Sequence, residues 1–254
     1  MLPYKFGNDF KLKNIEKVVD SLILWLRKKV EEASCEGVVF GMSGGIDSAV
    51  IAGLAKKAFP KSSLGIIMPC HSIEEDEEDA RLIGSELELD LIKVDLSRTY
   101  DEYMNSLGAK SEDMASANIK PRLRMTTLYY KAQKLNYLVI GSSNRSEFKI
   151  GYFTKHGDSG VDLLPLANFV KSEIYELARY LDINEKIIEK APSAGLWEGQ
   201  TDEEEMGLSY KTIDRYIKTG IIDDFSEKEK IDKLYELTKH KREYPPIFIY
   251  EEDE

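Results

Sequence analysis

The residues best suited to chemistry form one short stretch, SGGIDS, at residues 43–48. Paired glycines let the backbone turn so that several N–H groups point at one spot, and two hydroxyls and the Asp47 carboxylate surround that turn. An apolar run precedes the stretch and a helical pattern follows it. The turn therefore opens a helix, where the helix dipole favours a phosphate group.

The stretch does not match the P-loop of ATPases and GTPases, which needs a lysine directly after its last glycine. The first lysine here is Lys56, three turns into the predicted helix. An ordinary turn, with Ser43 as the helix cap and Asp47 favouring the first turn, would explain one serine and the aspartate. It would not explain the paired glycines together with two hydroxyls. A nucleotide bound here would be held differently from one in a P-loop.

The pattern around this turn predicts how it is positioned. Short β-rich runs lie at 38–42, 64–68, 91–96 and 137–141, and helical patterns lie at 12–33, 46–58, 73–89 and 111–135. Such alternation predicts an α/β fold, a doubly wound, mostly parallel, Rossmann-like sheet of about five strands with flanking helices. We expect a single domain over residues 1–254. Ligands bind at the carboxyl ends of strands in such sheets, which directs attention to Met42, Met68 and Gly141.

Composition narrows the classes of function. The 254 residues are 42% hydrophobic and 32% charged, with a net charge of −11, as in a globular protein. This acidity argues against a general binder of nucleic acid or anionic membranes. The longest early apolar run lies inside a charged helical pattern, so neither a signal peptide nor a membrane span is predicted. Cys35 and Cys70 lack metal-ligand spacing, and we expect a cytoplasmic protein.

Two glycine-rich stretches lie in the second half, KIGYFTKHGDSGVDLLP and KAPSAGLWEGQTD. Compact domains seldom keep long loops without a use for them, so we predict that 152–160 and 194–205 are mobile lids. The acidic run at 74–79 is interpreted as a helix N-terminus. Helical patterns follow in LSYKTIDRYIK and SEKEKIDKLYELTKHKREY.

These motifs together resemble a known family. SGGIDS resembles the phosphate loop of the ATP-pyrophosphatase superfamily, in which ATP is cleaved between its α and β phosphates. NIKPRLRM, GSSNRSEFKIGYFTKHGDSGVDLLPL and KAPSAGLWEGQTDEEEMG are similar to blocks of the ammonia-dependent NAD synthetases, in the order of that family. The resemblance covers residues 37–240. It implies that deamido-NAD is adenylated by ATP and that ammonia then displaces AMP to give NAD.

The resemblance also implies roles for individual residues. It places ATP on the loop 41–48 and on three further side chains, and Mg²⁺ on Asp47 and Glu147. Residues implied for ATP are Gly41, Met42, Ser43, Gly44, Gly45, Ile46, Asp47, Ser48, Ser142, Lys171 and Ser193; those for deamido-NAD are Arg122, Lys155, Asp162, His240 and Lys241. Ser142 departs from the threonine of many relatives but keeps a hydroxyl. Catalysis would involve Asp47, Glu147, Lys171 and, as a candidate for handling ammonium, Asp158, although turn chemistry alone could place an aspartate there.

Several alternatives stay open. Because the first strand begins near Val38, no room precedes it for an attached amidase domain, so we expect free ammonia as the nitrogen source, with a separate glutaminase subunit as the alternative. The family implies a homodimer, for which the helices at 12–33 and 111–135 offer apolar faces. Rival readings are a GMP-synthetase-like amidating enzyme, a tRNA-modifying enzyme, disfavoured by the acidic charge, and a nucleotide-binding regulator without catalysis.

Overall fold

A four-stranded parallel sheet lies at the centre of the molecule. The computed structural model describes residues 11–109, 113–193, 199 and 201–250. Within these, the strands are β1 (Gly37–Gly41), β2 (Ser63–Ile67), β3 (Asp90–Lys93) and β4 (Tyr137–Ile140), in the order β3-β2-β1-β4. Phe40 of β1 pairs with Gly65 on one side and Ile140 on the other. The chain therefore changes winding direction between β1 and β4, where ligands bind in such sheets.

Helices cover both faces of the sheet because β1 is apolar on both sides. Val38 and Phe40 pack into one core and Val39 into another. The first core is completed by α1 (Ile15–Glu32), α2 (Ile46–Ala58), α3 (Glu74–Glu86), α8 (Lys171–Tyr180) and α9 (Glu185–Glu189), the second by α4 (Ser97–Ser106) and α6 (Ile119–Leu135). The short α5 (Met114–Ala117) leads into α6. This confirms the predicted doubly wound α/β architecture.

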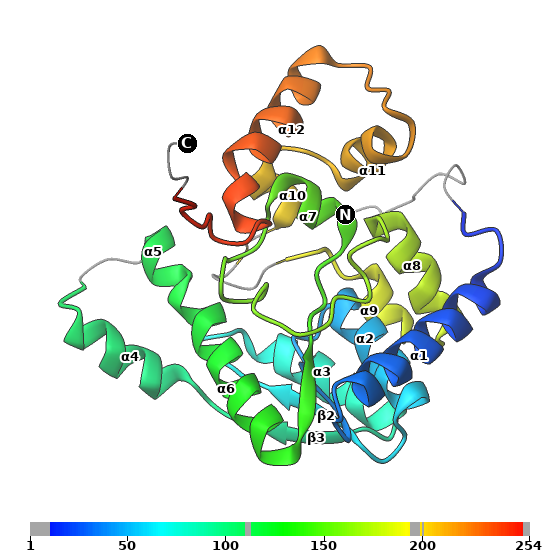
Figure 1. Ribbon diagram of the computed structural model, residues 1–254, viewed down its shortest axis with the longest axis vertical. Helices are drawn as coiled ribbons and strands as arrows, with labels where there is room; N and C mark the ends of the chain where they lie inside the picture. Colours follow the sequence, from blue (N-terminus) through cyan, green and yellow to red (C-terminus); the bar gives the residue numbers. More distant parts are fainter. Residues whose placement is uncertain (1–10, 110–112, 194–198, 200, 251–254) are drawn as a thin grey trace.

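A third cluster of buried side chains is formed by helices that lie above the sheet in Figure 1. It joins α7 (Arg145–Ile150), α10 (Asp202–Met206), α11 (Tyr210–Thr219) and α12 (Phe225–Leu237), which is followed by the 3₁₀ helix η2 (Lys239–Lys241). Tyr210 and Ile213 of α11 and Ile231 of α12 are fully buried in this cluster. The chain thus places an all-helical layer opposite the carboxyl ends of β1 and β4.

The observed sheet contains the predicted strands but is smaller than predicted. All four predicted strands are present, but the described residues form four strands rather than about five. The fifth position holds a single parallel bridge between Leu163 and Ile140, because the segment at 162–163 makes only a few backbone contacts with β4. The acidic run does begin α3, as predicted.

Two other expectations are corrected in part. The helix predicted at 111–135 is divided into α5 and α6, and residues 110–112 lie outside the described residues. The loop predicted at 194–205 ends in α10, which begins at Asp202 after the side chain of Thr201 caps it. Residues 194–198 and 200 of that predicted lid lie outside the described residues.

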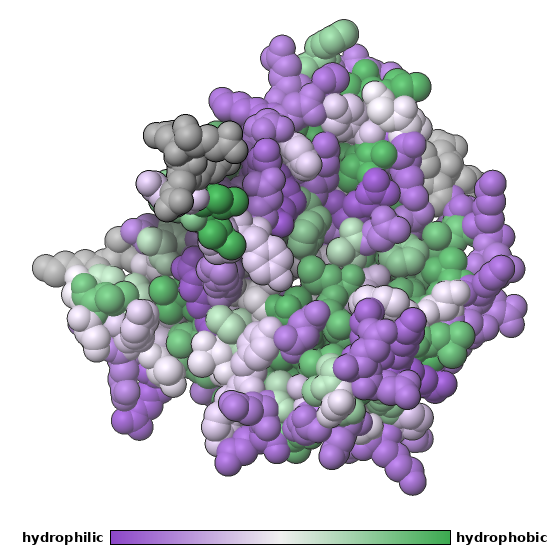
Figure 2. All heavy atoms as spheres, in the orientation of Figure 1, coloured by the Kyte–Doolittle hydropathy of each residue, from purple (hydrophilic) through white to green (hydrophobic). Residues whose placement is uncertain are grey.

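Hydrophilic residues cover much of the surface seen in Figure 2. Figure 2 shows hydrophilic residues over the outer helices and hydrophobic residues gathered in the middle of the same face. Among the described residues, no helix combines the length and the apolar character that crossing a membrane requires.

Candidate functional site

A cavity of about 570 Å³ lies between the carboxyl ends of β1 and β4 and the helical layer. Its walls come from the loop after β1, the start of α6, the loop after β4, α8 and α10. Lining residues predicted from the sequence are Gly41, Met42, Ser43, Gly45, Ile46, Asp47, Ser48, Ser142, Glu147, Asp158, Lys171, Ser193 and Lys241. Its volume is in the range of small-molecule sites.

The predicted phosphate loop forms a tight turn at the start of α2. Gly44 has φ +79°, a conformation that side chains disfavour, and Gly45 is the N-cap with φ −91°. The Ser43 hydroxyl accepts a hydrogen bond from the Gly45 N–H at 3.3 Å and donates one to the Ser48 hydroxyl at 3.0 Å. The suggestion that Ser43 caps the helix is therefore wrong, because Gly45 occupies that position. Gly44 supports the turn without lining the cavity.

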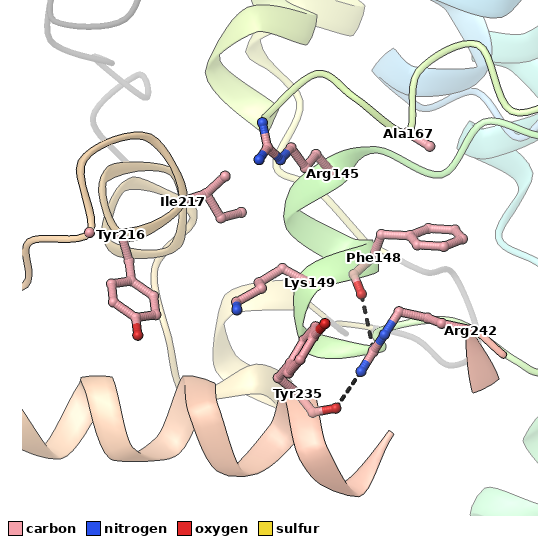
Figure 3. A pocket seen from close by; sticks show the side chains of 9 residues that line it. Arg145, Phe148, Lys149, Ala167, Tyr216, Ile217, Tyr235 and Arg242 are labelled. Carbon is pink, nitrogen blue, oxygen red and sulfur yellow. Dashed lines mark hydrogen bonds between the residues drawn. The ribbon is translucent and has the colours of Figure 1, made fainter. Parts of the chain in front are cut away.

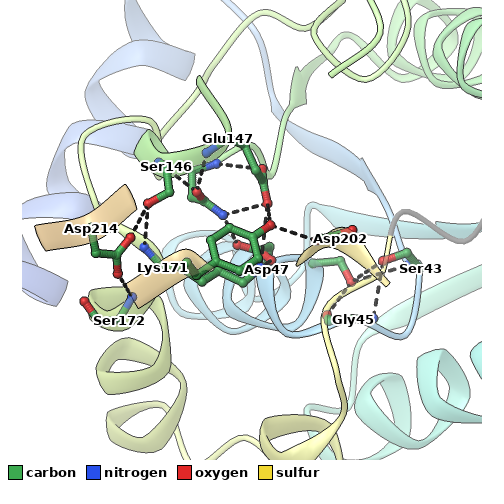
Figure 4. Close-up of polar contacts among 12 residues, drawn as sticks. Ser43, Gly45, Asp47, Ser146, Glu147, Lys171, Ser172, Asp202 and Asp214 are labelled. Atoms are coloured by element: carbon green, nitrogen blue, oxygen red, sulfur yellow. Dashed lines mark hydrogen bonds and ion pairs between the residues drawn. The ribbon is translucent and has the colours of Figure 1, made fainter. Parts of the chain in front are cut away.

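Three predicted residues from distant parts of the chain meet beside this loop (Figure 4). Lys171 Nζ lies 2.5 Å from Asp47 Oδ2 and 3.6 Å from Glu147 Oε1. The lysine side chain is 2% exposed, whereas the two carboxylates keep 17% and 15% of their side-chain surface open. Lys171 Nζ also lies 4.9 Å from the centre of the Tyr210 ring. A buried ammonium therefore lies behind two carboxylates that remain accessible.

Asn144, which the sequence analysis missed, holds the two carboxylates in register. Its Nδ2 donates to Asp47 Oδ1 at 3.0 Å and to Glu147 Oε1 at 2.7 Å. Asn144 is also the N-cap of α7, and its Oδ1 accepts hydrogen bonds from Ser146 N and Glu147 N. Glu147 Oε2 in turn accepts a hydrogen bond from Asn144 N at 3.2 Å, which completes a capping box. The pattern N-R-S-E was the sequence signal for this arrangement.

The charges of the three central groups depend on one another. Burial raises the pKa of Glu147 to about 8, and the nearby Asp47 adds to this while Lys171 opposes it. Burial alone would lower the pKa of Lys171, but Asp47 and Glu147 outweigh it and raise that pKa above the usual value. Lys171 is thus a fixed positive charge.

Asp214 of α11 positions both helices that carry this centre. Its Oδ1 accepts a 2.5 Å hydrogen bond from the Ser146 hydroxyl on α7, and its Oδ2 accepts one of 2.8 Å from Ser172 N on α8. The N-cap of α8 is Val170, whose side chain cannot cap. Asp214 therefore serves as the cap from another helix. No sequence pattern revealed this role.

Arg122, Lys155 and His240, which were predicted for the dinucleotide, do not line the cavity but are chain neighbours of the lining residues Pro121, Thr154 and Lys241. Arg122 Nη2 lies 3.4 Å from the Lys155 carbonyl oxygen, and Lys155 Nζ donates to the His240 carbonyl at 2.6 Å. Lys241 reaches the cavity itself and donates to the carbonyls of Gly151 and Phe153 at 2.9 and 2.8 Å. The structure thus brings segments near 122, 155 and 240 to one edge.

Asp162 and Asp158 lie differently. Asp162 Oδ1 accepts a hydrogen bond from the Tyr129 hydroxyl at 3.0 Å, and its Oδ2 accepts one from Val139 N at 2.8 Å. Asp162 is exposed and does not line the cavity. Asp158 does line it, and accepts from Thr154 N at 2.8 Å. Although its side chain is open to the cavity, the protein around it reduces its contact with water, and this burial raises its pKa.

Two further basic residues in the cavity were missed. Arg124 Nε donates to the Met68 carbonyl at 3.1 Å and Arg124 Nη2 to the Ser72 hydroxyl at 3.2 Å. Lys190 lies 2.8 Å from Asp76 and 2.5 Å from Asp79, which also pairs with Lys186. Arg124 lies two residues beyond the predicted Arg122, on the same turn of α6, and belongs to the same NIKPRLRM motif.

The acidic side chains of the cavity are possible ligands of a metal ion. No group of three or more His, Cys, Asp or Glu within the described part of the chain is arranged to hold one. The cavity wall nevertheless carries an excess of carboxylates, seven acidic side chains against four basic ones. Two accessible carboxylates side by side suit Mg²⁺, which takes one or two such ligands and completes its shell with phosphate and water. The residues present therefore fit a magnesium ion that is shared with a phosphorylated substrate.

Comparison with known proteins agrees with this geometry. A family model described as NAD synthase matches residues 18–245. The NH(3)-dependent NAD(+) synthetase of Carboxydothermus hydrogenoformans is 54% identical over 241 residues, covering 92% of this chain and 98% of that protein. The structure of NMN synthetase from Francisella tularensis has a TM-score of 0.90 at 37% identity, covering 95% of this chain and 100% of that one. The NH3-dependent NAD synthetase from Campylobacter jejuni has a TM-score of 0.78 at 29% identity, covering 94% and 100%.

Proposed function

The chain belongs to the NAD synthase family, and from that premise we propose how its cavity carries out the reaction. The chain is an ammonia-dependent NAD synthetase, a ligase that amidates deamido-NAD with ammonia and ATP. This assignment decides against the GMP-synthetase-like, tRNA-modifying and non-catalytic alternatives. The observation that carries the proposal is the meeting of Asp47, Glu147 and Lys171 beside the phosphate loop.

We propose that ATP binds with its phosphates on the loop 41–48. The Gly45 N–H and the hydroxyls of Ser43 and Ser48 lie at the N-terminus of α2, where the helix dipole adds positive charge. Ser142 and Ser193 would contact the nucleotide from the opposite wall. Lys171 stays protonated beside the phosphates, so its positive charge stabilises negative charge that develops on them.

Asp47 and Glu147 are the proposed ligands of Mg²⁺. When bound, the ion would neutralise the phosphates and polarise the α-phosphate for attack. Asn144 fixes the orientation of both carboxylates through its Nδ2. Because seven acidic side chains line the cavity against four basic ones, a polyanionic substrate needs this additional positive charge.

The proposed chemistry has two steps. First, a carboxylate oxygen of the nicotinate attacks the α-phosphorus of ATP, the bond to the β-phosphate breaks, and pyrophosphate leaves. Ammonia then attacks the carbonyl carbon of the acyl-adenylate, AMP leaves with the C–O bond electrons, and the nitrogen loses a proton. Asp158 is the proposed acceptor that binds ammonium, since its raised pKa makes it a better base than an ordinary aspartate.

Arg122, Lys155, Asp162, His240 and Lys241 are the proposed contacts for deamido-NAD. The first two, with the carbonyl of His240, form a linked basic edge suited to a pyrophosphate. Asp162 is held by Tyr129 and Val139, which leaves its exposed edge available for a ribose hydroxyl. The relative named NMN synthetase makes nicotinate mononucleotide a second candidate substrate, which would use less of this edge.

We further propose a cytoplasmic homodimer. The apolar stripe of α1 is buried against α2 and α8, so it cannot also serve a partner chain. On the opposite face, Tyr103 of α4, Leu107 just after α4 and Tyr130 of α6 are 46%, 58% and 59% exposed. This leaves the α4–α6 face, rather than α1, as the surface for a second copy.

The experiment follows products after purified protein is mixed with ATP, Mg²⁺, ammonium and deamido-NAD, with each component omitted in turn. NAD, AMP and pyrophosphate should appear in equal amounts and only in the complete mixture. A parallel series with nicotinate mononucleotide measures the ratio of kcat/KM values. Pyrophosphate release only with the mononucleotide would assign the chain to that substrate, and no release with either would refute the proposed reaction.

A further inference from the structure

A second cavity of about 470 Å³ lies between α7, α11 and α12 (Figure 3). Arg145 and Lys149 line it from one face of α7, four residues apart, whereas Glu147 between them points to the first cavity. Tyr216 and Ile217 of α11, Tyr235 of α12 and Arg242 complete most of its wall. The two cavities have no lining residue in common.

The second cavity concentrates positive charge in an acidic protein. Among the described residues, its lining includes three basic side chains, Arg145, Lys149 and Arg242, and no acidic one, although the whole chain carries a net charge of −11. Arg242 Nη1 donates to the Phe148 carbonyl at 3.1 Å, and its guanidinium lies 4.4 Å from the centre of the Tyr235 ring. Arg242 is therefore anchored by its own chain.

Arg145 and Lys149 are less completely satisfied. Arg145 is half-buried, and its guanidinium makes no hydrogen bond or ion pair with any residue that the structure describes. Lys149 Nζ lies 4.0 Å from the centre of the Tyr235 ring and 5.7 Å from that of Tyr216, and it forms no ion pair with a carboxylate in the described part of the chain. Cations facing aromatic rings keep capacity for an anion, because a ring offers no full negative charge.

Acidic residues around the cavity do not cancel this charge. Asp232 is engaged by the Tyr216 hydroxyl at 2.8 Å and by Lys228 at 2.6 Å. Like charges that repel one another in a hollow are stabilised when an anion binds between them.

We propose that this second cavity is a binding site for a small organic anion, a phosphate ester or a carboxylate. The oxyanion would lie between Arg145 and Lys149, where a guanidinium can offer paired N–H donors. The apolar part of the ligand would contact Ile217 and the edge of Tyr216. The cavity volume is in the range of sites for such molecules. The site is separate from the reaction and does not depend on the proposed catalytic roles.

Binding there would act on the catalytic centre through α7 and through Lys241 and Arg242 at the end of η2. Glu147 lies on the other face of the same six-residue helix. Lys241, next to Arg242, donates to the carbonyls of Gly151 and Phe153 just beyond that helix. A ligand that joins Arg145 to Lys149 would therefore hold α7 from its outer side.

The test is calorimetric titration of the intact protein with inorganic phosphate, AMP and nicotinate. Deamido-NAD and a non-hydrolysable α,β-methylene analogue of ATP are present throughout, so that the first cavity is filled. At least one probe should bind at one site per chain with a Kd below about 10 mM. Tighter binding of phosphate and AMP would identify a phosphate site, and tighter binding of nicotinate a carboxylate site.

Arg145→Gln should weaken this binding about tenfold or more, since a charge-assisted contact is lost. Arg98→Gln is the matched control, because Arg98 lies on α4 and its side chain is 92% exposed. Lys149→Gln is a second variant in case Arg145→Gln disturbs α7, which the affinity for the ATP analogue would reveal. Absence of saturable binding in the wild type, or equal affinity in both cavity variants and the control, would overturn the proposal.

Discussion

Replacing Asp214 by alanine should loosen two helix N-termini at once. Asp214 is 1% exposed and accepts hydrogen bonds from the Ser146 hydroxyl on α7 and from Ser172 N on α8. Lys171 N in turn donates to the Ser146 hydroxyl at 3.1 Å. The variant would leave the Ser172 N–H unsatisfied inside the protein and release the start of both helices.

The magnitude follows from the groups involved. A hydrogen bond to a charged group contributes about 1.5–3 kcal/mol, and a lost helix cap costs about 1 kcal/mol. Burial raises the pKa of Asp214, so keeping this carboxylate ionised costs part of the free energy that its hydrogen bonds contribute. We therefore expect a loss of about 3 kcal/mol in the free energy of unfolding, or about 6–12 °C in Tm for a chain of this size.

Urea unfolding and steady-state kinetics would measure the two effects. Because α7 and α8 carry Glu147 and Lys171, kcat should fall about 10- to 100-fold even where the variant is folded. Asp224→Ala is the matched control, since Asp224 caps the exposed start of α12 by accepting from Ser226 N at 2.8 Å. It should cost about 1 kcal/mol and leave kcat unchanged. If Asp214→Ala costs no more than Asp224→Ala, the argument for capping between helices is wrong.

Three further predictions concern the loop, the acidic helix and the carboxylates. Gly44→Ala should abolish ATP binding and lower Tm, because φ is +79° and a Cβ would clash with a backbone carbonyl. In Gly45→Ala the added Cβ would meet nothing closer than 3.5 Å, so this control should bind ATP in calorimetry as the wild type does. Burial acts to raise the pKa of Asp79, but hydrogen bonds from its two lysine partners outweigh this and lower it. The contribution of Asp79 to stability is therefore present above the unfolded pKa, about 3.9, and is lost as the pH falls through the folded pKa. Asp79→Asn should flatten the dependence of the urea midpoint on pH below about 5. An unchanged slope would contradict the pairing of Asp79 with the two lysines. Asp47→Asn and Glu147→Gln should each lose most adenylation in Mg²⁺ while far-UV circular dichroism stays native, and a wild-type rate of pyrophosphate release in either would remove it from the proposed metal site.

Much of the framework was accessible from the sequence because its causes are local. The helix at 46–58 was predicted with the bounds of α2, since the glycine turn and the apolar spacing both act within a few residues. The strands were found from runs buried on both faces. α10 was missed, because a five-residue helix leaves little periodicity and its start depends on the Thr201 side chain.

Recognition of the site rested on motifs rather than on contacts. The blocks placed Asp47, Glu147 and Lys171 in one centre before any geometry was known, and the structure brings them together. The capping box of Asn144 and Glu147 could have been found from N-R-S-E, a signal that spans four residues. Asp162 could not have been placed from its loop, because its partners Tyr129 and Val139 come from a helix and a strand.

The sequence by itself determined which glycine turn opens α2, which runs become strands and which family the motifs resemble. Only the tertiary structure decided that Lys171 meets Asp47 across 124 positions and that Asp214 caps α8. It alone showed that three basic side chains gather behind α7. Turn and helix signals act over a few residues, so they can be read along the chain. Contacts between distant residues depend on how all the layers pack, and a burial-driven pKa, such as that of Glu147, exists only once packing has excluded water.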